Sequence, residues 1–321
     1  MSDCQINFPS PQPKNFILLA GPTAVGKSEI ALALAGRVGG EIVSVDSMQV
    51  YRGLDLGTAK PSPADRARVP HHLIDVVEVT EPFDAAQFAR LARQAVAEIQ
   101  SRGRVPILCG GTGLYFKAFL EGLGDAPPAD EKLRAELATT PLPELLRELA
   151  ERDPSAYERI DRQNPRRVIR AIEVIRLTGK PFSQQRAEWK SESRIQNPEA
   201  RFFGFSRAPA DLRARIDTRV GKMFTQGLVE ETRQLLERGL AQNQTAMQAI
   251  GYRQVVEQLR GEPRTLPGLP ETIELVKIRT RQFAKRQMTW FRRQLSLEWI
   301  ELKPADAPEA VAALVKARLK M

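Results

Sequence analysis

The sequence predicts an α/β protein with a central parallel sheet flanked by helices, into which a separate all-helical domain is inserted. Three observations lead to this prediction. Short apolar runs alternate with helical patterns up to about residue 120, and glycine-rich segments follow two of these runs. Beyond about residue 122, prolines and helical patterns replace the strand-like runs. Regular alternation of strands and helices is typical of a parallel sheet covered by helices.

The first strand, loop and helix of the predicted sheet follow one another directly. Phe16–Ala20 is a short, continuous apolar run, as expected of a strand that is buried on both faces. The segment Gly21–Ser28, GPTAVGKS, comes next and leads into a predicted helix over Lys27–Val38. A second strand-like run, Ile42–Asp46, ends in an acidic residue.

A further helix and strand complete this half of the core. Asp84 is suited to cap a helix, and Val105–Cys109 then returns to strand character before the glycine-rich turn Gly110–Gly113. Ligands of open parallel sheets gather at the carboxyl ends of the strands. We therefore expect Gly21–Ser28, Asp46 and Gly110–Gly113 to share one cleft.

The second half of the chain is predicted to be mainly helical. Arg201–Phe205 is predicted to be the last core strand, with a mostly helical remainder. Residues 14–122 together with 201–321 are therefore expected to form the catalytic core. Residues 123–200 are expected to form the inserted helical domain.

The segment Gly21–Ser28 matches the phosphate-binding pattern G-x-x-x-x-G-K-[ST] and lies between a strand and a helix, which predicts a P-loop NTPase-like core. Its glycines allow close wrapping of the backbone, Lys27 adds a positive charge, and Ser28 would ligate Mg²⁺. The alternative is a glycine turn that binds nothing. The pattern leaves the rest of the ligand open, with ATP as the default. The candidate diphosphate-binding residues are Gly21, Pro22, Thr23, Ala24, Val25, Gly26, Lys27 and Ser28.

Asp46 is a candidate functional residue because it lies at the carboxyl end of a strand. This position favours a catalytic base or a role beside a metal, and the alternative is a carboxylate that caps a turn. His71 and His72 are the only histidines. Adjacent side chains of an extended chain point in opposite directions, so we interpret this pair as structural rather than as zinc ligands.

The composition indicates a soluble, cytoplasmic protein with a polyanionic partner. Lys and Arg number 48 against 39 Asp and Glu, a net charge of +9, which favours nucleic acid, although surplus charge also serves solubility. Cys4 and Cys109 do not make a disulfide framework. No apolar stretch is long enough to span a membrane, and the first residues lack the pattern of a signal peptide.

Basic residues gather in three regions. In the predicted helix Lys277–Leu295, one side is apolar and the other carries Arg279, Arg281, Lys285, Arg286, Arg292 and Arg293, with no acidic residue between them. The apolar side carries Phe283, Ala284, Met288, Trp290, Phe291 and Leu295. Two more clusters comprise Arg162, Arg166, Arg167 and Arg170, and Arg213, Arg215 and Arg219. Separated arginine-rich surfaces suit a folded RNA that is bound by its backbone.

Taken together, these segments resemble the tRNA dimethylallyltransferases, also called tRNA isopentenyltransferases. The likeness covers nearly the whole chain, and six collinear motifs beyond GPTAVGKS carry it. These are DSMQVYRGLDLGTAKP (Asp46–Pro61), HHLID (His71–Asp75), GGTGLYFKA (Gly110–Ala118), NPRRVIRAIEV (Asn164–Val174), AIGYR (Ala249–Arg253) and TRQFAKRQMTWFR (Thr280–Arg292).

The resemblance implies that the bound diphosphate is dimethylallyl diphosphate rather than ATP. It implies that the acceptor is N6 of adenosine 37, next to the anticodon, in tRNAs that read codons beginning with U. Mg²⁺ is the implied cofactor, and the inserted domain would grip the anticodon stem-loop. We also expect a monomer.

The family's roles transfer to matching residues of this chain. Asp46 would be the base at the amine, with Thr23, Lys27, Ser28 and Arg219 around the diphosphate. Arg281 and Lys285 of the basic helix are also expected to contact the tRNA. The other residues expected there are Asp46, Ser47, Met48, Gln49, Thr112, Arg134, Arg166, Arg167, Val168, Ile169, Arg170, Gln248, Ala249, Ile250, Gly251, Tyr252 and Arg253.

Two other functions stay open from the residues alone. A P-loop kinase of small molecules would turn over ATP and ignore tRNA. A nucleic-acid-binding adaptor with a vestigial P-loop would bind RNA without chemistry. An Asp46 carboxylate beside an intact P-loop favours the transferase over both.

Overall fold

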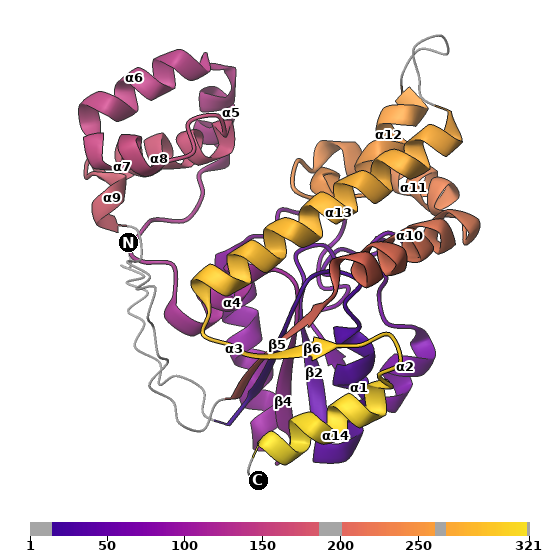
Figure 1. The fold of residues 1–321 in the computed structure, drawn as a ribbon. Helices are drawn as coiled ribbons and strands as arrows, with labels where there is room; N and C mark the ends of the chain where they lie inside the picture. The colour runs from indigo at the N-terminus through magenta and orange to yellow at the C-terminus, as the bar shows by residue number, and fades with distance from the viewer. Residues whose placement is uncertain (1–14, 186–200, 261–267, 320–321) are drawn as a thin grey trace. The chain divides into compact units, whose positions relative to one another are not determined.

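The computed structural model of the chain describes most of the sequence (Figure 1). Cys4 and the end of the predicted insertion lie outside the described residues. Of the described part, no helix is long and apolar enough to cross a membrane. The described ranges are 15–185, 201–260 and 268–319.

The chain forms two compact units. An α/β unit is drawn from residues 1–120 and 191–321, and a helical unit from residues 121–190. The sequence predicted an insertion over residues 123–200, and the end of that range lies outside the described residues. The expected fold class, a parallel sheet flanked by helices with an inserted helical domain, is confirmed.

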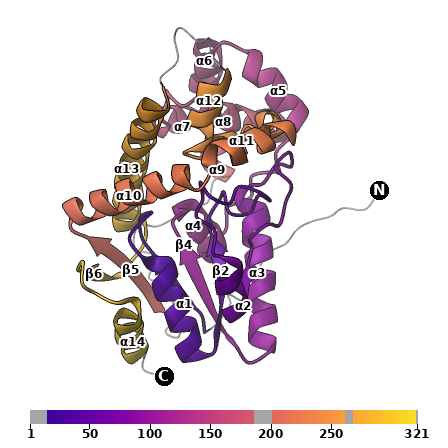
Figure 2. The same ribbon diagram turned by 90° about the vertical axis from the view of Figure 1, so that its right-hand side faces the viewer.

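The sheet of the α/β unit has six strands in the order β3-β2-β4-β1-β5-β6, and each neighbouring pair is parallel. β1 therefore lies in the interior between β4 and β5, and the two faces of the sheet are covered by different helices (Figure 2). The strands are β1 (Ile17–Ala20), β2 (Gly40–Val45), β3 (His71–His72), β4 (Val105–Gly110), β5 (Arg201–Arg207) and β6 (Glu298–Leu302).

The helices of the α/β unit include one long and several short ones. They are α1 (Lys27–Val38), α2 (Pro63–Arg68), α3 (Ala85–Ser101), α4 (Gly113–Glu121), α10 (Pro209–Thr225), α11 (Leu228–Glu237), α12 (Tyr252–Arg260), α13 (Leu269–Gln294) and α14 (Pro308–Arg318), with the 3₁₀ turns η1 (Leu240–Gln242) and η2 (Ala246–Gln248). α4 ends at the boundary with the helical unit.

Residues of β1 alternate between two hydrophobic cores, one on each face of the sheet. Leu18 contributes to a core with Phe88 of α3 and Phe291 of α13. Leu19 contributes to the other core, which α1 and α14 cover. A strand that is buried on both faces needs apolar side chains at consecutive positions, which explains the uninterrupted run ILLA.

Local signals in the sequence set the ends of the first helices. α1 spans the predicted residues and begins after Gly26, whose φ of 105° is unfavourable for residues with a side chain. α3 begins at the predicted cap, because the Asp84 side chain accepts hydrogen bonds from the amides of Ala86 and Gln87. β2 ends at Val45, so Asp46 is the first residue after the strand rather than its last.

The prediction that the strand at Arg201–Phe205 is the last of the core was wrong. β6 follows it and pairs in parallel with β5 at the edge of the sheet. Only Ile300 and Leu302 of β6 are buried, and the acidic residues between and before them break the apolar run that marks the interior strands. An edge strand of this kind carries a weak sequence signal.

The prediction for the basic helix also needs correction. α13 begins at Leu269 rather than at about Lys277, and the added turns contain Glu271 and Glu274. Glu274 forms ion pairs with Lys277 and Arg281. The basic face is therefore not free of acidic residues over the full length of the helix.

The helical unit has a core of its own. Leu145, Leu149, Val168 and Ile172 belong to one buried cluster. α8 is capped by Asn164, whose side chain accepts a hydrogen bond from the Arg167 amide. The helices are α5 (Glu131–Thr139), α6 (Leu142–Arg152), α7 (Pro154–Arg159), α8 (Pro165–Thr178) and α9 (Phe182–Gln185).

Candidate active site at the carboxyl edge of the sheet

Three loops leave the sheet at the same level. Ala20 of β1 pairs with Gly110 of β4, and Gly110 also pairs with Val45 of β2. The P-loop after β1, the loop that starts at Asp46 and the turn that starts at Gly111 therefore begin side by side. The fold thus brings together the three segments that the sequence assigned to one cleft.

The P-loop is tightly packed against β5 and closed by a hydrogen bond from its lysine. A Cβ atom on Gly21 would lie 2.9 Å from the carbonyl oxygen of Phe205, so only glycine fits there. Lys27 Nζ donates a hydrogen bond to the Pro22 carbonyl at 3.2 Å, which folds the lysine over the loop. This lysine and the amino end of α1 give the loop the positive character that an anion requires.

Two arginines that follow the P-loop by almost two hundred residues hold its backbone. Arg215 Nε donates to the Ala24 carbonyl at 2.9 Å, and Arg207 Nε donates to the Val25 carbonyl at 2.8 Å. The cluster of Arg213, Arg215 and Arg219 is therefore not one RNA-facing surface, because Arg215 is used within the fold. Only tertiary contacts reveal this role.

Two cationic side chains, Lys27 and Arg219, interact electrostatically with Asp46. Burial lowers the pKa of the Lys27 amine and Arg219 lowers it further, while Cys109 and Asp46 oppose these effects. Burial also lowers the pKa of the Arg219 guanidinium, which stays charged, and Asp46 again opposes the shift. Arg219 Nη2 donates to the Thr58 carbonyl at 3.3 Å. The carboxylate of Asp46 therefore lies within electrostatic range of both cations.

One oxygen of Asp46 caps a turn. Asp46 Oδ1 accepts hydrogen bonds from the Met48 amide at 2.8 Å and from the Gln49 amide at 3.3 Å. The neighbouring Ser47 amide donates to Thr112 Oγ1 at 3.1 Å, which ties this loop to the turn after β4. The capping role weighed from the sequence is present, and it fixes the carboxylate through one oxygen only.

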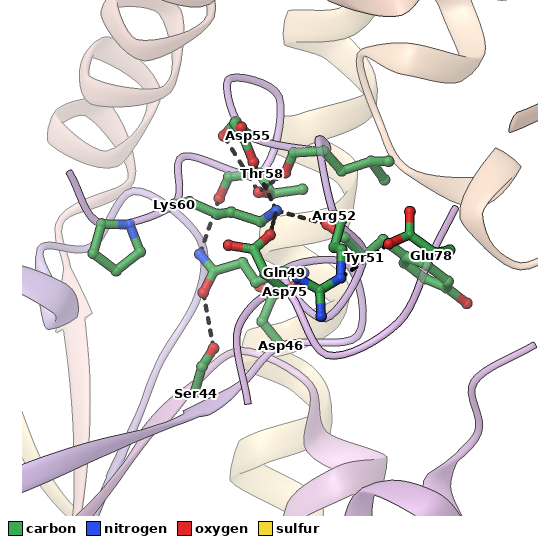
Figure 3. A network of polar contacts seen from close by, with 12 residues as sticks. Ser44, Asp46, Gln49, Tyr51, Arg52, Asp55, Thr58, Lys60, Asp75 and Glu78 are labelled. Carbon is green, nitrogen blue, oxygen red and sulfur yellow. Dashed lines mark hydrogen bonds and ion pairs between the residues drawn. The ribbon is translucent and has the colours of Figure 1, made fainter. Parts of the chain in front are cut away.

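A buried lysine organises the rest of the loop (Figure 3). Lys60 Nζ donates to the Tyr51 carbonyl and to Asp75 Oδ1, both at 2.6 Å, and to Asp55 Oδ1 at 2.7 Å. Its side chain is 3% exposed. Burial raises the pKa of Asp75, but hydrogen bonds from Lys60 and Arg66 outweigh this effect and hold it below its usual value. The network fixes the shape of the segment that follows Asp46.

A glutamine of α13 joins two of the loops. Gln287 Oε1 accepts a hydrogen bond from the Thr23 amide, and its Nε2 donates to the Gly111 carbonyl, both at 2.9 Å. The helical pattern placed α13 correctly in the core but gave no sign of this residue, because its two partners lie far away in the sequence.

The histidines and the described cysteine make local contacts. A ring nitrogen of His71 lies 2.7 Å from the Val69 carbonyl, and His72 Nε2 lies 2.7 Å from Glu41 Oε2. Burial raises the pKa of the Cys109 thiol to about 11, so it stays protonated at neutral pH. The thiol donates to the Lys27 carbonyl at 3.7 Å, so contacts within the fold account for all three side chains.

The predicted tRNA residues of the helical unit fall into three groups. Arg166 and Arg167 are exposed on the first turn of α8. Arg134 and Arg170 instead pair with Glu173, whose side chain is completely buried, at 2.9 Å and 2.5 Å. Val168 and Ile169 pack into or against the core of the unit, where their side chains serve packing.

The segment Gln248–Arg253 of the α/β unit is similarly divided. Ala249 and Tyr252 are buried, and the Tyr252 hydroxyl donates to Glu231 at 2.5 Å and accepts from the Gly57 amide at 3.0 Å. Gln248 and Arg253 are exposed, while Gly251 has a φ of 99°. The buried members shape the loop around Gly57, and the exposed members face solvent.

The basic face of α13 borders a groove of about 520 Å³. Lys285 lies in this groove, whereas Arg281 is held by Asp217 at 2.6 Å. The predicted faces agree with the structure for Ala284 and Phe291, which are buried. The groove is lined by Gln282, Lys285, Arg286, Thr289, Trp290, Arg293 and Gln294.

Metal ligands are few at the P-loop. Within the described residues, no group of three or more His, Cys, Asp or Glu side chains comes together as a metal site. Ser28, exposed at the first turn of α1, offers one hydroxyl. This donor set fits Mg²⁺, which commonly takes its other ligands from phosphate oxygens and water.

Comparison with known proteins gives consistent matches. A family model described as IPP transferase matches residues 49–294. The tRNA dimethylallyltransferase of Geobacter sulfurreducens is 45% identical over 291 residues, which cover 89% of this chain and 91% of that protein. The tRNA dimethylallyltransferase of Geobacillus thermodenitrificans is 43% identical over 309 residues, 94% of each chain.

Solved structures give the same result. The tRNA isopentenylpyrophosphate transferase of Bacillus halodurans aligns with a TM-score of 0.67 and 37% identity, covering 96% of this chain and 97% of that one. A eukaryotic dimethylallyltransferase, described as acting on tRNA, aligns with a TM-score of 0.78 and 26% identity, covering 96% of this chain and 80% of its own.

Proposed function

The chain belongs to the IPP transferase family, and we propose that it transfers the dimethylallyl group of dimethylallyl diphosphate to a tRNA. The acceptor is N6 of adenosine 37, next to the anticodon, in tRNAs that read codons beginning with U. The products are N6-(dimethylallyl)adenosine and diphosphate. The protein is a prenyltransferase, and a kinase reading is not favoured by its relatives.

One observation of the structure carries the proposal. Asp46 follows β2 at the same edge of the sheet where the P-loop leaves β1, within electrostatic range of the Lys27 amine and the Arg219 guanidinium. A diphosphate held by the two cations would therefore lie beside a carboxylate that can accept a proton. This combination suits a nucleophilic substitution in which the diphosphate leaves and an amine attacks.

Departure of the diphosphate is the first part of the chemistry. The bond between C1 of the allyl group and the diphosphate oxygen breaks as negative charge builds on the leaving group. Lys27, Arg219 and the P-loop amides stabilise that charge from fixed positions, and each such donor contributes about 3 kcal/mol, or roughly a hundredfold in rate. Thr23 contributes its hydroxyl at the same place.

Attack by the adenine amine is the second part. The lone pair of N6 is delocalised into the ring, which makes the amine a poor nucleophile. As the N6–C1 bond forms, one N6 proton passes to Asp46. Because the turn amides occupy Oδ1, we assign proton acceptance to Oδ2, which no described side chain or amide engages.

Mg²⁺ is the proposed metal at this site. The Ser28 hydroxyl would bind it together with oxygens of the diphosphate. Once bound, the ion supplies additional stabilisation of the leaving charge. A diphosphate held by Lys27 and Arg219 would present its allylic carbon toward Asp46.

The tRNA contacts are proposed from exposed basic residues. Arg166 and Arg167 of the helical unit and Lys285 of α13 are suited to phosphate contacts. The adenine must leave its stack to reach Asp46, which costs only a few kcal/mol and least in a single-stranded loop. The anticodon stem-loop suits this requirement. We further propose that the enzyme works as a monomer in the cytoplasm.

A transfer assay tests the proposal against its rivals. The protein is incubated with dimethylallyl diphosphate labelled in the allyl group, Mg²⁺ and unmodified tRNA, and in parallel with labelled ATP. We expect label in the RNA only from the allyl donor, and no turnover of ATP. Turnover of ATP without transfer would establish a kinase, and RNA binding without either reaction would establish an adaptor.

A further inference from the structure

Gln287 occupies an unusual place for a long polar side chain. It lies in α13, is only 7% exposed, and follows the buried Ala284 by about one turn on the buried side of the helix. A buried amide costs free energy unless its donor and its acceptor are both satisfied. Both are satisfied here, and by backbone groups of the candidate active site.

The two hydrogen bonds join loops from adjacent strands. Gln287 Oε1 accepts from the Thr23 amide of the P-loop at 2.9 Å. Gln287 Nε2 donates to the Gly111 carbonyl, in the turn after β4, also at 2.9 Å. The side chain therefore spans from the donor-binding loop to the loop that contacts the segment of Asp46.

The turn after β4 is shaped to receive α13. A Cβ atom on Gly111 would lie 2.4 Å from Gln287 Nε2, and one on Gly113 would lie 2.2 Å from the Trp290 ring. Gly113 is therefore needed for the close approach of the helix, and Gly111 leaves room for the Gln287 amide in its hydrogen-bonded position. Two of the three glycines of GGTG, Gly111 and Gly113, thus lie against Gln287 and Trp290.

The connection continues from Gly111 toward the proposed base. Thr112, the next residue, accepts a hydrogen bond from the Ser47 amide through its hydroxyl and donates its own amide to the Val45 carbonyl. Ser47 directly follows Asp46. A displacement of the Gly111 carbonyl would therefore be transmitted through Thr112 to the turn that holds Asp46.

We propose that Gln287 is a positioning residue of the transfer reaction, which fixes the diphosphate loop at Thr23 and the Asp46 turn in one register. The inference rests on the proposed prenyl transfer at this site. Since the Thr23 amide is used by Gln287, Thr23 contacts the diphosphate through its hydroxyl. In this proposal, the Gln287 side chain determines the distance between the diphosphate and the Asp46 carboxylate.

The chemistry of the position favours an amide. Thr23 presents an N–H and Gly111 presents a carbonyl, so the bridging group must accept on one side and donate on the other. A methionine fills the space but does neither. An ionised glutamate accepts on one side, repels the Gly111 carbonyl on the other, and adds negative charge beside the diphosphate. A protonated glutamic acid restores both hydrogen bonds.

The test compares Gln287→Met and Gln287→Glu with wild type and with Gln94→Met, which replaces an exposed glutamine of α3. Single-turnover transfer rates, KM for each substrate, tRNA affinity and thermal unfolding are measured together. We expect Gln287→Met to lower kcat by about tenfold to a hundredfold, because small misplacements of reacting groups have effects of this size. tRNA affinity should stay within about twofold of wild type.

The pH profile separates positioning from a purely structural role. The rate of Gln287→Glu relative to wild type should rise as the pH is lowered, because protonation restores the donor to Gly111. The relative rate of Gln287→Met should stay constant over the same range. A structural role would instead lower the melting temperature and leave kcat per folded molecule unchanged, which would overturn the proposal.

The outcomes distinguish this inference from the function on which it rests. If wild type transfers label and both Gln287 variants keep kcat within twofold, only the role of Gln287 fails. If wild type transfers no label to tRNA, the proposed function fails, and the positioning role fails with it. Gln94→Met should match wild type in every measurement.

Discussion

The side chain of Asp46 both caps a turn and is the proposed base, and two substitutions can distinguish these roles. Asp46→Asn keeps an oxygen that can accept from the Met48 and Gln49 amides, so the turn should be retained. The amide cannot take up the N6 proton. A positioned base contributes about a hundredfold to ten-thousandfold in rate, or roughly 2.7–5.4 kcal/mol, and kcat should fall by that amount.

Asp46→Ala provides the matched comparison. It removes both hydrogen bonds of the turn as well as the base, and each such bond contributes about 0.5–1.5 kcal/mol to stability. Besides the loss in rate, we therefore expect the unfolding free energy, measured with urea, to fall by about 1–3 kcal/mol. Single-turnover transfer with saturating tRNA measures the rates. An Asn variant within tenfold of wild type would refute the base role and leave only the cap.

Three further predictions concern stability and RNA binding. Lys60→Met should lower the unfolding free energy by about 2 kcal/mol. This is less than the usual cost of breaking a buried ion pair, because Asp75 is partly exposed. A change under about 0.5 kcal/mol would contradict the role of the Lys60 network. The pKa of Asp75 is lowered in the folded state, so ionised Asp75 stabilises the fold above about pH 4, and this stabilisation is lost as the pH falls through the pKa of the folded state. In urea unfolding across about pH 2–6, Lys60→Met should therefore lose less stability on acidification than wild type. Replacing Arg166 and Arg167 with Gln should reduce the slope of log affinity against log salt by about one unit per lost phosphate contact; an unchanged slope would remove both from the interface.

Local sequence signals predicted the P-loop and the helix ends, which depend on residues close to one another in the chain. GPTAVGKS fixes the P-loop and the start of α1, because glycines and a lysine at fixed spacing are needed to wrap an anion. Asp84 predicted the start of α3 for a similar reason, since a capping carboxylate acts on amides two and three residues away. The neighbouring strands then follow from the alternation of apolar runs and helices.

Long-range contacts determine the parts that the sequence did not predict. Gln287, Arg207 and Arg215 act on backbone groups that are between about 180 and 265 residues away in the chain. Their residue types fit a surface as well as a site, so spacing alone cannot separate the two. β6 was missed for a different reason, because an edge strand with one exposed face needs few apolar residues.

The basic motifs were predicted as surfaces, but the fold divides them. In NPRRVIR, Arg166 and Arg167 are exposed, Val168 is buried, and Arg170 is bound to Glu173. One turn of helix presents consecutive side chains in different directions, so a contiguous motif has both binding and packing members. Arg170→Gln should accordingly destabilise the helical unit more than it changes the salt dependence of tRNA binding.

The central claim is that the P-loop holds an allylic diphosphate whose carbon is attacked by the amine of adenosine 37. The most direct measurement is nuclease digestion of the product tRNA followed by mass spectrometry of the fragments and nucleosides. The account predicts one dimethylallyl group, on N6 of adenosine 37, that depends on Asp46. A group attached at another nucleotide or atom, or an unmodified tRNA after full incubation, would contradict it.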